Sequence, residues 1–233
     1  MSALAHYLEE EGVASVAIAL VRPQAEKTRP PRALWVPFEL GRPFGPPSDP
    51  AFQKRVLLAA LDLLEAPAGR GPVLLADFPD DDPRELPDPR WQPPASGAVT
   101  IEDEIAALGP AYERSRAERG RTTVGLSGLA PQDAAAYVAT WLAGPPPASL
   151  VSDMSPILSL RFAVDDLKAY ALEAAAAAGF RPSSKQLGDW LWNDSATGAA
   201  IRRLRTKLTA GDDERIKQIA GLFLVPALRV AAS

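Results

Sequence analysis

The sequence predicts an α/β protein in which a small, mostly parallel sheet with flanking helices is followed by a helical C-terminal domain. Strand-like, loop and helical segments alternate along the first 65 residues. A proline-rich break, GPPPAS at 144–149, then precedes alanine-rich segments with helical periodicity. We therefore expect an α/β domain at 1–146 and a helical domain at 147–233.

The alternation begins at the N-terminus. Residues 3–11 predict a short helix that ends at Gly12, and the apolar run at 13–20 predicts a strand. A proline-flanked loop leads to a second predicted strand at 33–38. Strand, loop and helix in this order are typical of an α/β layer.

A helix and a linker follow. Asp49 and Pro50 fit the N-cap and the first residue of a helix that continues to Leu64. The stretch 77–94 is rich in proline and aspartate, which predicts a linker or a long surface loop. The stretch begins with four closely spaced aspartates, Asp77, Asp80, Asp81 and Asp82. Their spacing lacks the glycine and the closing glutamate of a calcium loop, so we expect a solvated acidic turn there.

The middle of the chain predicts a helix from Thr100 to Arg119, a short strand at 121–128 and a helix from Pro131 to Leu142. In the C-terminal domain we expect four helices. The first spans 162–179, and the second begins with a capping box at Ser183 and Gln186 and ends at about Trp192. The third spans 197–208, and the fourth begins after a cap at Asp212 or Asp213. Trp190 and Trp192 fall on opposite sides of their helix, which predicts one buried ring and one ring at an interface or pocket.

Composition excludes several classes of function. The chain has no cysteine, which rules out a disulfide scaffold, a thiolate zinc site, an iron–sulfur cluster and a cysteine nucleophile of its own. The formal net charge of −4 argues against a general binder of nucleic acid or anionic membranes. No run is long enough for a membrane span, and the acidic N-terminus lacks the pattern of a signal peptide, so we expect a cytoplasmic protein.

The single histidine, His6, narrows the chemistry further. A two-histidine metal site is impossible within one protomer, and no G-x-S-x-G elbow accompanies His6. Glu9 and Glu10 follow it at helical spacing, but we favour a partly exposed histidine on a helix face over a metal ligand. We expect no metal and no cofactor.

The first 65 residues resemble a known family. The segments EEEGVASVAIALV, PPRALWVPFELGRPFGPP and LAALDLLE are similar to the selenoprotein B family of glycine, sarcosine, betaine and D-proline reductases and its uncharacterised relatives. Residues 12–20 correspond to a strand of that family and residues 31–43 to the next strand and its loop, with Leu40, Gly41 and Pro43 at the diagnostic positions. The segment RGRTTVGLSGLAPQDAAAYVATWL also resembles the uncharacterised relatives.

The resemblance implies reductive chemistry that depends on a selenocysteine or cysteine in a loop just before the helix at 3–11. This chain starts at Met1, where that loop would end, and has neither residue. Three explanations stay open: a start codon read after a UGA selenocysteine codon, one half of a split enzyme, or a paralogue that lost the chemistry. The expected partner is a second copy of the chain, or a companion subunit that carries the redox loop.

The predicted binding site lies at the carboxyl ends of the strands, where open α/β sheets hold their ligands. We expect the loop after the second strand to bind a small carboxylate or amide, with Arg42 pairing with a carboxylate. The N-terminus of the first helix should point at the same crevice and favour an anion. The candidate residues are Glu39, Gly41, Arg42 and Gly45 in the loop, and Ser2, Ala3 and Leu4 in the helix. The alternative is a rigid surface turn with a solvated arginine.

A second class of function is a non-enzymatic binding or regulatory protein with a helix–turn–helix-like C-terminal domain. The helix at 197–208 carries four basic residues, Arg202, Arg203, Arg205 and Lys207. However, Ile201, Leu204 and Leu208 form an apolar stripe, so the basic residues fit the outer face of an ordinary amphipathic helix. We therefore do not expect nucleic-acid binding.

Overall fold

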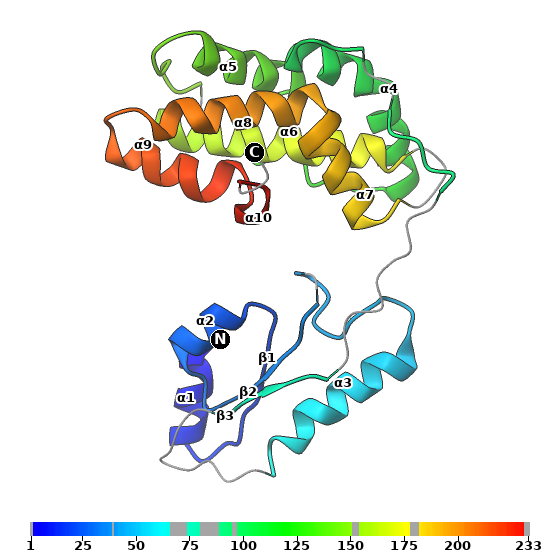
Figure 1. Ribbon diagram of the computed structural model, residues 1–233, viewed down its shortest axis with the longest axis vertical. Helices are drawn as coiled ribbons and strands as arrows, with labels where there is room; N and C mark the ends of the chain where they lie inside the picture. Colours follow the sequence, from blue (N-terminus) through cyan, green and yellow to red (C-terminus); the bar gives the residue numbers. More distant parts are fainter. Residues whose placement is uncertain are drawn as a thin grey trace. The chain divides into compact units, whose positions relative to one another are not determined.

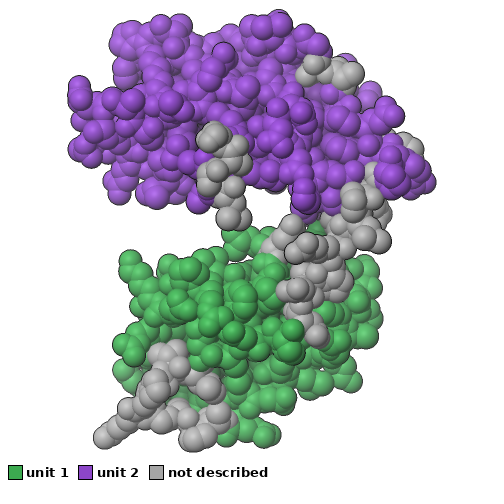
Figure 2. Space-filling view, in the orientation of Figure 1, with its two compact units in different colours: residues 1–85 green, residues 86–233 purple. Residues whose placement is uncertain are grey.

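The computed structural model describes residues 2–38, 40–65, 74–79, 89–94, 97–150, 154–177 and 182–230. The chain forms two compact units, Met1–Glu85 and Leu86–Ser233, which Figure 2 distinguishes by colour. No helix among the described residues has the length and apolar character needed to cross a membrane. Each unit is described by itself below.

Unit 1 contains a small parallel sheet with flanking helices, which confirms the predicted α/β class (Figure 1). The three strands among its described residues are hydrogen-bonded in the order β1-β2-β3, and both pairings are parallel. The register aligns Ala19, Trp35 and Asp77 across the sheet. The elements are α1 (Ser2–Glu10), β1 (Ala17–Ala19), α2 (Arg22–Thr28), β2 (Arg32–Trp35), α3 (Pro50–Asp62) and β3 (Leu74–Asp77).

Helix α2 replaces the loop that we expected between the first two strands. Pro23 lies in its first turn, a position where the missing N–H of proline costs no helical hydrogen bond. The helix ends at Arg29, which adopts the left-handed conformation and donates its N–H to the Ala25 carbonyl. The prolines that suggested a loop therefore flank and start a short helix.

One face of the sheet packs against α3. Alternate strand residues point to the same face, and those on the α3 face join a single apolar cluster. Phe38, Phe52 and Phe78 meet at its edge, with ring centroids 5.5 to 5.9 Å apart. The buried members of this cluster are Leu34, Val36, Phe38, Phe52, Val56, Ala60 and Phe78.

Helix α1 is held by a charged cluster beside the amino ends of β1 and β2. The buried Arg32 at the start of β2 forms an ion pair with Glu9 of α1. Glu9 Oε1 also accepts the main-chain N–H and the hydroxyl of Ser15, at 2.6 and 3.2 Å. Burial favours the neutral acid, but the Ser15 hydrogen bonds and the Arg32 charge together lower the pKa of Glu9 below its usual value.

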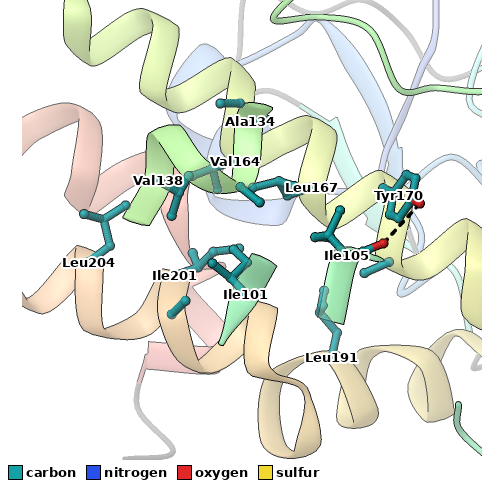
Figure 3. Packing of buried hydrophobic residues seen from close by; sticks show 14 of the residues in the cluster. Ile101, Ile105, Ala134, Val138, Val164, Leu167, Tyr170, Leu191, Ile201 and Leu204 are labelled. Carbon is teal, nitrogen blue, oxygen red and sulfur yellow. Dashed lines mark hydrogen bonds between the residues drawn. The ribbon is translucent and has the colours of Figure 1, made fainter. Parts of the chain in front are cut away.

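Unit 2 is helical throughout its regular elements (Figure 1). Figure 3 shows its core, where side chains of α4, α5, α6 and α8 meet and the Tyr170 hydroxyl donates to the Ile105 carbonyl at 3.2 Å. The elements are α4 (Ile101–Arg119), α5 (Pro131–Ala143), α6 (Pro156–Ala175), α7 (Ser184–Asp189), η1 (Trp190–Asp194), α8 (Ala196–Thr209), α9 (Glu214–Ile219), η2 (Ala220–Leu224) and α10 (Ala227–Val230).

The division between the units falls after Glu85, whereas we expected it at 146/147. The reason is the packing of α4 and α5, which we had assigned to the α/β domain. Both helices pack against α6 and α8, and their apolar side chains belong to the same cluster as those of the C-terminal helices. The proline-rich segment at 144–149 is therefore a connection between two helices of one unit.

The segment 121–128, which we expected to be a strand, is a loop fastened to α6 by two carboxylates. Asp166, which is 1% exposed, accepts the Gly125 and Leu126 N–H groups at 2.8 and 2.9 Å. Its second oxygen accepts the N–H and the hydroxyl of Ser127 at 2.8 and 2.6 Å. Side chains of α6, rather than a neighbouring strand, satisfy these main-chain donors.

About two helical turns farther along α6, Glu173 binds the start of the same loop. Its carboxylate accepts the Thr123 N–H, the Thr123 hydroxyl and the Thr122 hydroxyl at 2.7 to 2.8 Å. Burial opposes ionisation, yet the hydrogen bonds from Thr123 and Thr122 and the nearby charge of Arg119 lower the pKa of Glu173 below its usual value.

This lowered pKa predicts a pH-dependent stability of unit 2. In the unfolded chain, Glu173 becomes protonated near its ordinary pKa of about 4.3. In the folded chain, it becomes protonated only at a lower pH, because its pKa is lowered. The stabilisation from Glu173 is therefore complete above the ordinary pKa and is lost as pH falls through the lowered pKa. Urea unfolding at a series of acidic pH values should show a steeper loss of stability for the wild type than for Glu173→Gln.

Glu118→Gln, which removes an exposed carboxylate of α4, controls for the loss of one charge. Equal slopes for the wild type and Glu173→Gln would contradict the assigned role of Glu173.

Candidate ligand-binding site

Three side chains converge at the carboxyl edge of the unit 1 sheet. Arg22 begins α2 soon after β1 ends, Trp35 is the last residue of β2, and Asp77 is the last residue of β3. Parallel strands bring their carboxyl ends to one edge, and the register places Trp35 directly beside Asp77. This edge is the position at which open parallel sheets bind their ligands.

Arg22 connects the members of this cluster. Its Nη1 donates to both carboxylate oxygens of Asp77, each at 2.8 Å, and its Nε donates to Glu26 Oε1 at 2.9 Å. Its guanidinium carbon lies 5.1 Å from the centroid of the Trp35 ring, within the range of a cation–π contact. The hydrogen bonds that Arg22 donates to Asp77 and, next, to Glu26 raise the pKa of Arg22 above its ordinary value.

The cluster is open to solvent. The side chains of Arg22, Asp77 and Glu26 are 40%, 51% and 54% exposed. Exposed ion pairs of this kind contribute little to stability, typically about 0–1 kcal/mol. The arginine can therefore exchange Asp77 for another carboxylate without unfolding the sheet edge.

The predicted loop follows the carboxyl end of β2, but its residues differ in what they do. Glu39 lies outside the described residues. Gly45 is buried and has a positive φ of 85°, and a Cβ there would lie 2.4 Å from the Phe52 ring, so this glycine serves packing. Gly41 is exposed at a φ of 93°, and Arg42 is half-buried. Gly41 and Arg42 stay predictions as ligand contacts.

The first turn of α1 does not join this site. The Ser2 hydroxyl lies 2.8 Å from the Thr28 hydroxyl, at the end of α2 that leads into the start of β2. Ser2, Ala3 and Leu4 therefore lie toward the amino ends of the strands, whereas the 40–45 loop follows a carboxyl end. Our expectation that both would face one crevice is wrong, because α1 is tied to the far end of α2.

Sequence reasoning did not single out Arg22, Trp35 or Asp77 as a group. The available signal was the rule that ligands bind at the carboxyl ends of parallel strands. Applied to every strand, it would have selected Arg22 soon after the first strand and Trp35 within the second. Asp77 was noted only as one of the acidic residues at the start of the linker.

Unit 2 has an open hollow of about 530 Å³ between the start of α4, the end of α5 and α8. Basic residues of α8 that could have contacted nucleic acid have structural roles here. Lys207 Nζ donates to the carbonyls of Trp141, Leu142 and Gly144 at 2.6 to 3.1 Å, and so caps α5. The Arg202 guanidinium lies 5.8 Å from the centroid of the Trp192 ring.

Within the described ranges, no group of three or more histidine, aspartate and glutamate side chains could hold a metal ion. His6 Nε2 lies 2.7 Å from the Arg29 carbonyl, which connects α1 to the end of α2. In comparisons with protein-family models, curated proteins and solved structures, none matches this chain.

Proposed function

We propose that unit 1 binds a small carboxylate- or amide-bearing ligand at the carboxyl edge of its sheet. On this proposal the chain is the ligand-binding, scaffold component of a system related to the selenoprotein B reductases. The observation that carries the proposal is the cluster of Arg22, Trp35 and Asp77, in which an exposed, oriented guanidinium lies over an aromatic ring.

Each member of the cluster suits one part of such a ligand. Arg22 can pair with a carboxylate through two parallel hydrogen bonds, in place of the pair that it now makes with Asp77. Asp77, once released, can accept an N–H from an amide or an amine. The face of Trp35 offers apolar and cation–π contact beside both groups.

On this proposal, another protein chain must supply the reducing group. The chain has no cysteine, and neither His6 nor a hydroxyl supplies a nucleophile of the strength that reductive cleavage needs. A companion chain with a thiol or selenol would complete the reaction on the ligand that unit 1 holds.

Calorimetric titration with glycine, betaine, D-proline and acetamide tests the proposal. We expect Arg22→Gln to weaken binding of the carboxylates several-fold, because an exposed pair of charged groups contributes up to about 1 kcal/mol. Trp35 is the only tryptophan of unit 1, so a ligand-dependent fluorescence change that is absent in Trp35→Phe would locate the site.

Lys54→Gln is the matched control, because it removes one exposed positive charge from α3 of the same unit. It should leave the affinity unchanged. The absence of binding to the wild type by all four compounds, or equal affinities for the wild type and Arg22→Gln, would refute the proposal.

A further inference from the structure

We propose that the free edge of β1 pairs with β1 of a second copy of this chain, so that two unit 1 sheets form one continuous six-stranded sheet. This inference goes beyond the proposed ligand site and uses a different part of unit 1. It rests on the orientation of the main chain along β1, on the residues at the two sheet edges, and on the apolar surface around β1.

The main chain of β1 has hydrogen-bonding groups that face away from β2. The Val36 N–H donates to the Ala19 carbonyl at 3.0 Å, so the main-chain groups of Ala19 face β2. In a strand of a parallel sheet, the main-chain groups of successive residues face the neighbouring strands on opposite sides. The N–H and C=O groups of Ile18 therefore face away from β2. Among the described residues, no strand pairs with that side of β1.

The two edges of the sheet differ in how they are protected. Proteins block unwanted strand pairing with charges, prolines or bulges on their edge strands. The β3 edge ends in Asp77, and Pro79 follows two residues later. Along the β1 edge, residues 16–21 read Val-Ala-Ile-Ala-Leu-Val, with no charge and no proline. The β1 edge is therefore open to pairing, whereas the β3 edge is not.

Exposed apolar side chains flank β1 along the chain. Val13 and Val21, before and after β1, are 52% and 46% exposed. Even Ile18, which packs against the α3 face of the core, stays half-buried. A partner strand would remove part of this apolar area from water.

A second copy fits the edge by its chemistry. If β1 pairs antiparallel with β1 of a second chain, the two chains are related by a two-fold axis and each contributes the same surface to the interface. Residues 16–21 carry no charge, so self-pairing brings no like charges together along the strand. The exposed Glu10 and Glu11 precede β1, and Arg22 follows it, so antiparallel pairing places acidic and basic ends side by side.

Sedimentation equilibrium of the full chain tests this inference, together with hydrogen exchange of the Ile18 amide. We expect a reversible dimer with a slowly exchanging Ile18 amide. The double variant Val13→Lys with Val21→Lys adds charges at exposed positions on both sides of β1. It should raise the dimer dissociation constant at least tenfold and speed exchange at Ile18, with an unchanged thermal unfolding temperature at concentrations where both proteins are monomeric.

Leu222→Lys is the matched control, because it places the same charge at a 65% exposed apolar position in unit 2 and should leave the dimer intact. Ile18→Pro removes the outward N–H, along with the Ile18 side chain, and should also give a monomer. A monomeric wild type at all concentrations, or a dimer that the double variant does not weaken, would overturn the inference. Trp35→Phe changes the ligand site on β2 and should leave the association state unchanged, so the ligand-site proposal can fail independently.

Discussion

Replacement of Gly198 by alanine should destabilise unit 2 by about 3 kcal/mol or more, because the new methyl group overlaps the main chain. A Cβ at this position would lie 1.8 Å from the Leu191 carbonyl oxygen. That oxygen also accepts the Ser195 hydroxyl at 2.7 Å, and Ser195 Oγ accepts the Gly198 N–H at 2.8 Å. The turn between η1 and α8 therefore cannot open without breaking its own hydrogen bonds.

Chemical denaturation followed by circular dichroism would measure this effect. Gly221→Ala, within η2 of the same unit, is the control, because the nearest atom to its Cβ would be Thr209 Cγ2 at 4.0 Å. It should change the free energy of unfolding by less than about 0.5 kcal/mol. A Gly198→Ala protein as stable as this control would show that the turn is looser than described.

Asp166→Ala should cost unit 2 on the order of 3–5 kcal/mol, because it leaves several buried donors without an acceptor. The carboxylate accepts four hydrogen bonds from three successive residues of the loop, Gly125, Leu126 and Ser127, of which the N–H and hydroxyl of Ser127 are buried and the other two N–H groups are partly buried. Asp166→Asn should recover only part of the loss, because an amide nitrogen would face the donors of one side.

Hydrogen exchange at the Gly125, Leu126 and Ser127 amides separates local release of the loop from general destabilisation. In Asp166→Ala these amides should exchange faster than those of the α4 core. Asp165→Ala removes the neighbouring carboxylate of α6, which pairs with Lys168 at 2.7 Å, and should cost less than about 1 kcal/mol. Equal losses for the two variants would argue against the role of Asp166.

Local signals in the sequence predicted much of the fold. The N-caps at Asp49, Thr100 and Ser183 are confirmed, each with its side chain accepting a hydrogen bond from the first turn of its helix. Of the two alternatives for the last cap, the structure selects Asp213. These features depend on residues three or four positions apart, so a single sequence contains the information that determines them.

Features that depend on distant residues were missed. The 121–128 segment has the composition of a strand, but its acceptors, Asp166 and Glu173, lie 39 to 51 residues farther along the chain. Arg22 and Asp77 of the candidate site are 55 residues apart. Neither pairing produces a local periodicity, so only the folded chain reveals it.

The tryptophan pair shows a third limit. We expected one of Trp190 and Trp192 to be buried and the other to lie at an interface or pocket, yet both belong to the core of unit 2 and are only 3% and 7% exposed. Helical spacing predicts that the rings point in different directions, but it does not tell what lies on each side. The η1 segment contacts both α6 and α8, and Arg202 covers the Trp192 ring, so both sides of the segment are enclosed.

The attachment of the 121–128 loop to α6 also sets an order of events during synthesis. The loop is synthesised before Asp166 and Glu173, because both carboxylates come later in the chain. Until α6 forms and docks, water must satisfy the donors of the loop. The connection between α4 and α5 therefore becomes fixed only after the third helix of unit 2 arrives, although it is made before that helix.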